Sequence, residues 1–106
     1  MSIMIVGGDS LGAINKELLS LGAEEILHVD GRKSGKNARL CIPERIALVL
    51  VFTDYVNHNT AKLVKRLSKL NGVSYLFAKR SWTSLEGHGV RRYFPVAAPE
   101  SKGGSL

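Results

Sequence analysis

The chain of 106 residues contains a single cysteine, Cys41. One cysteine excludes an internal disulfide and a metal site built from several cysteines. His28, Cys41 and His58 also show none of the spacings at which metal ligands recur, so we expect no metal site. A chain without disulfides suits a reducing compartment, and we expect a cytoplasmic location.

Long hydrophobic runs are also missing. The longest apolar run, Ile46–Phe52, is far shorter than the roughly 20 residues that a membrane-spanning helix needs. The first residues, Met1–Val6, lack a basic segment and enter a strand pattern directly, so we expect no signal peptide and no membrane partner. The length predicts one folded domain.

Acidic residues are scarce after the first third of the chain. Residues 1–30 carry one lysine against five acidic residues, a net charge of −4, whereas residues 31–106 carry fourteen basic against four acidic residues, a net charge of +10. This basic excess favours an anionic partner such as a nucleotide, a phosphate or a nucleic acid. A solvated basic surface is the alternative interpretation.

The run Ile46–Phe52 predicts the centre of the fold. It is continuous rather than alternating, which is typical of a strand buried on both faces in a parallel sheet. Further strand patterns and helical patterns alternate along the chain: strands over residues 3–6, 25–29 and 73–78, and helices over 11–21 and 57–70. We therefore predict an α/β domain of three layers, with a four-stranded parallel sheet in the order 2-1-3-4.

The helix predicted over 57–70 has an apolar stripe and a basic face. The stripe consists of Leu63, Val64, Leu67 and Leu70, and the basic face of Lys62, Lys65, Arg66 and Lys69. The helix over 11–21 is expected to have Asp9 or Ser10 as its N-cap and to stop at Gly22. Capping-box spacing predicts a short last helix from Thr83. We place the domain at residues 1–90 and a flexible tail at 91–106.

Polar side chains follow each predicted strand. Because the carboxyl ends of parallel strands meet at one edge of a sheet, where ligands of such folds bind, we predict one ligand site there. Its candidate residues are Gly7, Gly8, Asp9, Ser10, Asp30, Arg32, Asp54, Asn57, His58, Arg80 and Ser81.

These residue types suit the binding of an anion. Gly7 and Gly8 allow the backbone to approach a ligand at the start of a helix, although their spacing is not that of a dinucleotide fingerprint. Arg32 and Arg80 can grip phosphate or carboxylate with two hydrogen bonds each, or remain ordinary surface arginines. Asp30 can accept sugar hydroxyls, or can cap or pair with a basic side chain.

The sequence leaves open whether this edge of the sheet catalyses a reaction. Asp54 and His58 are candidate catalytic residues for general acid–base work, with a hydrogen-bonding role for His58 as the alternative. Ser10 and Ser81 lie in no recognisable nucleophile motif. Tyr55 and Trp82 can stack on a ring or serve in packing. The sequence specifies no cofactor, and it leaves enzyme activity undecided.

Four segments together resemble a small bacterial family, domain of unknown function 2325. They are Val6–Asp9, His28–Arg32, Phe52–His58 and Arg80–Trp82. The resemblance covers about residues 1–86 and implies a compact Rossmann-like domain of bacterial origin, without an established activity.

The expected function is therefore the binding of an anionic small molecule, such as a nucleotide or phosphate, at the carboxyl edge of the sheet. An alternative is a nucleic-acid-associated or regulatory interaction module that uses the basic helix 57–70. A third interpretation is a homodimer that pairs through the fourth strand or the last helix.

Overall fold

The computed structural model describes residues 1–8, 11–29 and 40–94. The elements in these ranges are β1 (Ser2–Val6), α1 (Ala13–Leu21), β2 (Glu25–Val29), β3 (Ile46–Phe52), α3 (His58–Asn71), β4 (Ser74–Ala78), α4 (Trp82–Gly87) and the 3₁₀ turn η1 (Val90–Tyr93). The strands form one parallel sheet in the order β2-β1-β3-β4. The predicted α/β class and strand order are confirmed.

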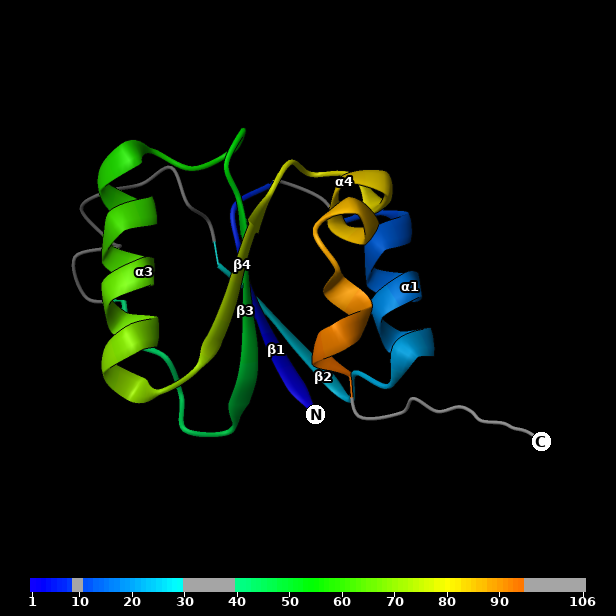
Figure 1. The fold of residues 1–106 in the computed structure, drawn as a ribbon, viewed down its shortest axis with the longest axis horizontal. Helices are drawn as coiled ribbons and strands as arrows, with labels where there is room; N and C mark the ends of the chain where they lie inside the picture. The colour runs from blue at the N-terminus through cyan, green and yellow to red at the C-terminus, as the bar shows by residue number, and fades with distance from the viewer. Residues whose placement is uncertain (9–10, 30–39, 95–106) are drawn as a thin grey trace.

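Helices cover both faces of this sheet. Figure 1 shows α3 on one side of the sheet, and α1, α4 and η1 on the other. Each face has its own core: Ile3, Ile5, Ile14, Leu18 and Leu85 lie in the core beneath α1 and α4. The opposite core includes Met4, Val6, Ile42, Val49, Val51 and Val64. The fold is therefore the three-layer domain that the sequence predicts.

The position of β3 between two helical layers explains why apolar and polar residues do not alternate in its sequence. Leu48, Leu50 and Phe52 pack into the core beneath α1 and α4, whereas Val49 and Val51 pack into the core beneath α3. Successive side chains of a strand point to opposite faces, so a strand with helices on both faces needs apolar residues at every position.

Helix α3 has the predicted boundaries within one residue, but its buried face differs from the predicted stripe. Val64 is buried and Leu67 packs partly against the same core, as predicted. Leu70 is 75% exposed, so its place in the stripe is wrong. The buried positions of the helix are Thr60, Val64 and Ser68, because their four-residue spacing keeps them on one side of the helix. Leu63 instead lines a surface hollow beside Arg66.

The predicted helix ends are correct at some positions and wrong at others. Helix α1 stops at Gly22 as predicted, but its N-cap is Gly12 and makes no side-chain cap hydrogen bond, so the prediction of Asp9 or Ser10 is wrong. Helix α4 begins at Trp82 rather than Thr83.

The folded part of the chain continues to Phe94. Val90 is the first residue of η1 and Phe94 directly follows it. Both are buried in the core beneath α1. The sequence shows no helical periodicity at these two residues, because a 3₁₀ turn followed by one buried aromatic residue is too short to produce a periodic pattern. Residues 95–106, most of the predicted tail, lie outside the described residues.

Candidate functional site

The carboxyl ends of the strands meet at one edge of the sheet, as the sequence predicts. The backbone N–H of Gly7, directly after β1, donates to the carbonyl of Val29 at 2.8 Å, and the N–H of Thr53 donates to Ala78 at 2.9 Å. His28 Nε2 donates to the carbonyl of Gly7 at 2.8 Å. These bonds fix the β1 and β3 ends relative to their neighbours β2 and β4, and thereby position the loops of the site.

Gly7 and Gly8 allow two other chain segments to approach β1 closely. Both residues have positive φ angles, 103° and 83°. A Cβ on Gly7 would lie 2.7 Å from Cγ1 of Val56, and a Cβ on Gly8 would lie 2.9 Å from Cδ of Arg80. The glycines are therefore required by the packing of the chain itself at this edge.

Arg80 lies at the centre of a small group of predicted site residues. Its backbone N–H donates to Oδ1 of Asp54 at 3.1 Å. Its guanidinium Cζ lies 5.3 Å from the centroid of the Tyr55 ring, within the range of a cation–π interaction. Together with Gly8 these residues form what we call the Arg80 cluster, which joins the ends of β1, β3 and β4.

Asn57 and Ser81 both serve as helix caps. Oδ1 of Asn57 accepts from the backbone N–H of Thr60 at 2.8 Å at the start of α3. Oγ of Ser81 accepts from the N–H of Ser84 at 3.0 Å at the start of α4. Each cap satisfies a helix N–H that has no partner within the helix.

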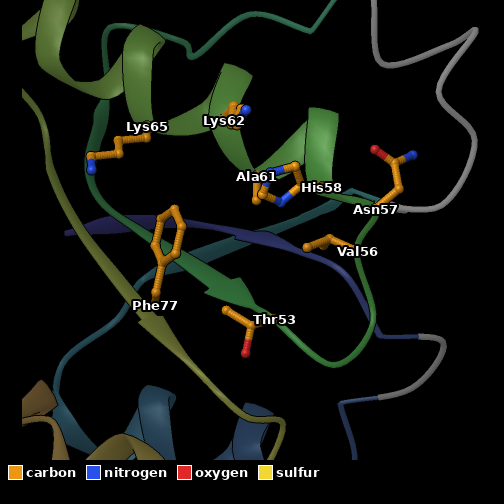
Figure 2. Close-up of a pocket in the computed structure, with 8 residues that line it drawn as sticks. All are labelled: Thr53, Val56, Asn57, His58, Ala61, Lys62, Lys65 and Phe77. Carbon is orange, nitrogen blue, oxygen red and sulfur yellow. The ribbon is translucent and has the colours of Figure 1, made fainter.

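A cavity of about 520 Å³ lies between α3 and the ends of β3 and β4. Its lining residues, shown in Figure 2, are Thr53, Val56, Asn57, His58, Ala61, Lys62, Lys65 and Phe77. We call it the α3 cavity. His58, Lys62 and Lys65 line it from α3, and the ring of Phe77 projects from β4 toward the helix.

A second hollow of about 470 Å³ adjoins the α3 cavity. It is lined by Asp54, Tyr55, Val56 and Asn57, so the two hollows share Val56 and Asn57. Asp54 and His58, the candidate catalytic pair, line different hollows. Oδ1 of Asp54 accepts from the backbone N–H of Arg80, so this carboxylate oxygen holds the start of the loop after β4.

Comparison with known families assigns the chain to one family. Residues 2–88 match the model of a bacterial family described as "Uncharacterized protein conserved in bacteria (DUF2325)". The chain belongs to the DUF2325 family. No curated protein and no solved structure matches it. The matched range contains the whole sheet and every candidate site residue, and it ends before η1.

The predicted site of this DUF2325 domain divides into three groups. Gly7, Gly8, Asp54 and Arg80 lie in or beside the Arg80 cluster. Asn57 and His58 lie at the α3 cavity, and Ser81 caps α4. The predicted residues that lie outside the described part of the chain are Asp9, Ser10, Asp30 and Arg32.

Sequence reasoning missed part of the DUF2325 cavity. It assigned Lys62 and Lys65 to an outer helix face, placed Thr53 only within the polar segment after the third strand, and gave no role to Phe77, although all four line the cavity. The available signal was the helical spacing of His58, Lys62 and Lys65, which places them along one side of α3. Phe77 carried no such signal, because the run Tyr75–Phe77 does not show which residues face α3.

Two further observations concern the described part of the DUF2325 chain. Within residues 1–8, 11–29 and 40–94, no group of three or more His, Cys, Asp and Glu side chains could hold a metal ion. Over the same ranges, no helix has the length and hydrophobicity needed to cross a bilayer.

Proposed function

We propose that this domain binds an anionic small molecule, such as a nucleotide or another phosphate compound, at the carboxyl edge of its sheet. The observation that carries the proposal is the lining of the α3 cavity by Lys62, Lys65 and His58, with no carboxylate among the described residues that line it. An anion there gains two positive charges and a ring N–H donor.

The surroundings of the two lysines support the same proposal. Within the described residues neither Lys62 nor Lys65 forms an ion pair. Thr53 and Asn57 also line the cavity, where Oγ1 of Thr53 donates to the carbonyl of Ala78 at 3.4 Å and Oδ1 of Asn57 caps α3. A volume of about 520 Å³ lies within the range of about 300–1,000 Å³ that is usual for small-molecule sites.

A thermal-shift screen of inorganic phosphate, pyrophosphate and nucleotides tests the proposal. A ligand at 100 times its dissociation constant stabilises the fold by about 2.7 kcal/mol, and each kcal/mol raises the melting temperature of a domain of this size by about 4–8 °C. Lys62→Ala combined with Lys65→Ala should abolish the shift, because both positive charges of the cavity are removed.

The matched control removes two positive charges from the same helix outside the cavity. Arg66 and Lys69 do not line the α3 cavity, so Arg66→Ala combined with Lys69→Ala should retain the shift. A screen in which no phosphate compound raises the melting temperature contradicts the proposal. So does a shift that both double variants lose equally, because the lost binding would then follow total charge rather than the cavity.

A nucleic-acid-associated or regulatory interaction module is the second candidate. It is favoured by the exposed basic face of α3, formed by Lys62, Lys65, Arg66 and Lys69. Nucleic-acid binding of this kind would weaken steeply with salt and would depend on all four side chains. The two double variants therefore separate the candidates, since only nucleic-acid binding should suffer in both.

The cellular setting and assembly of the domain are part of the proposal. We place it in the cytoplasm, because its one cysteine, Cys41, is free. Homodimer formation is supported by the position of β4 at an edge of the sheet, where unpaired strand groups can accept another strand. Light scattering at several protein concentrations measures the oligomeric state directly.

A further inference from the structure

The α3 cavity has walls of two different kinds. On one wall, Lys62 and Lys65 are three residues apart on α3, so their side chains are neighbours on the helix surface. On the other wall, the ring of Phe77 projects from β4 toward the helix (Figure 2). A ligand that fills the cavity therefore meets positive charge on one side and an aromatic ring on the other.

The Phe77 ring is held in a defined orientation. Tyr75, two residues earlier on the same face of β4, meets it edge to face with ring centroids 5.8 Å apart and planes inclined by 64°. Phe77 is only partly buried against the core beneath α3, so part of its surface remains for a ligand. An exposed aromatic surface beside a cavity suits stacking against a flat apolar ring.

We infer that the α3 cavity selects an anion that carries a planar aromatic ring, with a nucleoside monophosphate as the simplest example. This inference rests on the proposed function and adds the ligand class. The ring packs on Phe77 and Val56, and the anionic group lies against Lys62 and Lys65. Oγ1 of Thr53 donates to the carbonyl of Ala78 at 3.4 Å and can still accept from a sugar hydroxyl, whereas the ring of His58 can hydrogen-bond the sugar or the ring nitrogens.

Isothermal titration calorimetry with three probes separates the two parts of the ligand. Adenosine 5′-monophosphate carries both the ring and the charge, ribose 5-phosphate carries only the charge, and adenosine carries only the ring. The full chain should bind adenosine 5′-monophosphate about tenfold more tightly than ribose 5-phosphate, a difference that one base stacked on an aromatic side chain provides. Adenosine should also bind more weakly than the monophosphate.

Two substitutions at one position test the ring of Phe77. Phe77→Leu retains an apolar side chain but removes the aromatic surface, and it should reduce the preference for adenosine 5′-monophosphate over ribose 5-phosphate to near unity. Phe77→Tyr keeps the ring and should retain the preference. If Phe77→Leu does not fold, nuclear Overhauser contacts between the Phe77 ring and the adenine protons in the parent protein give the answer, and their absence overturns the inference.

The outcomes for the two proposals are distinct. Equal affinity for adenosine 5′-monophosphate and ribose 5-phosphate overturns the inference and leaves anion binding standing. A preference that survives Phe77→Leu overturns it as well. Failure of all phosphate probes to bind contradicts the proposed function itself.

Discussion

Arg80 covers Gly8. A Cβ on Gly8 would lie 2.9 Å from Cδ of Arg80, closer than real side chains approach. The absence of a side chain at position 8 therefore lets Arg80 reach across from the end of β4 and place its guanidinium over Tyr55. The glycine pair after β1 is explained by packing between strand ends, whatever ligand binds nearby.

The first prediction ranks three glycine substitutions by loss of stability. Gly72→Ala should cost about 1–2 kcal/mol from its left-handed backbone alone, since no atom lies within 4 Å of its Cβ position. Gly8→Ala should cost more because Arg80 must move. Gly7→Ala should cost most, with about 1–3 kcal/mol of overpacking added, because its Cβ would also meet the carbonyl of Phe52 at 3.2 Å.

Urea denaturation at neutral pH measures this ranking. Equal losses at the three positions would show that backbone strain alone matters. That result would contradict the close approach of Arg80 and Val56 to the end of β1.

The second prediction concerns a buried hydroxyl. Oγ of Ser68 is buried without a hydrogen-bond partner among the described residues. A buried hydroxyl left without a partner costs about 1–3 kcal/mol, so Ser68→Ala should raise the free energy of unfolding by about 1 kcal/mol. As a control of the same chemistry, Ser81→Ala should lower it by about 1 kcal/mol, since Oγ of Ser81 caps α4. A destabilising Ser68→Ala would show that this hydroxyl has a partner.

The third prediction concerns acid stability. Arg91 donates two hydrogen bonds to Glu86, at 2.6 and 3.0 Å, and they hold the pKa of Glu86 below its ordinary value of 4.5. Because the folded-state pKa is the lower one, the pair stabilises the protein above about pH 4.5. This contribution is lost as the pH falls through the folded-state pKa.

Urea midpoints measured from pH 7 to pH 2 for the parent and for Glu86→Gln check the sign. The parent should be the more stable protein at neutral pH, and the difference should shrink below pH 4.5. A difference that grows with acidity would refute the assignment. Glu25→Gln should behave in the same way, because hydrogen bonds from Arg45 lower the pKa of Glu25.

The fourth prediction locates the end of the folded core. Phe94 is only 8% exposed and packs into the core beneath α1, so Phe94→Ala should cost about 3 kcal/mol. The neighbouring Tyr93 is 37% exposed, and Tyr93→Ala should cost clearly less. Thermal unfolding of the two variants compares them. Equal effects would mean that the core ends before residue 94.

The sheet could be predicted from the sequence because its signal is strong. Seven consecutive apolar residues in β3 indicate a strand with helices on both faces. Once that strand is central, right-handed crossovers leave few strand orders, and the order with β1 beside β3 is the one found. Helix α3 was also predictable, since Asn57 and Gly72 are favourable ends for a helix.

The site was only partly predictable. The topology brings Gly8, Asp54 and Arg80 together, as the position after each strand implies. Asn57 and Ser81 also follow strands, but a residue of either type can cap a helix or bind a ligand, and in the structure their side-chain oxygens cap α3 and α4. The topology could not place Phe77 in the cavity, because the face of an edge-strand residue depends on pairing register, which a short apolar run does not reveal.

The central claim is that a small anion binds in the α3 cavity, and a titration followed by ¹H–¹⁵N nuclear magnetic resonance tests it most directly. Addition of adenosine 5′-monophosphate to the full chain should move the amide signals of Thr53, His58, Lys62, Lys65 and Phe77 along one saturable curve. The signals of Arg66 and Lys69, on the same helix but outside the cavity, should move little. If no signal shifts saturably, or if the largest shifts lie at Arg66 and Lys69, the result contradicts binding in the α3 cavity.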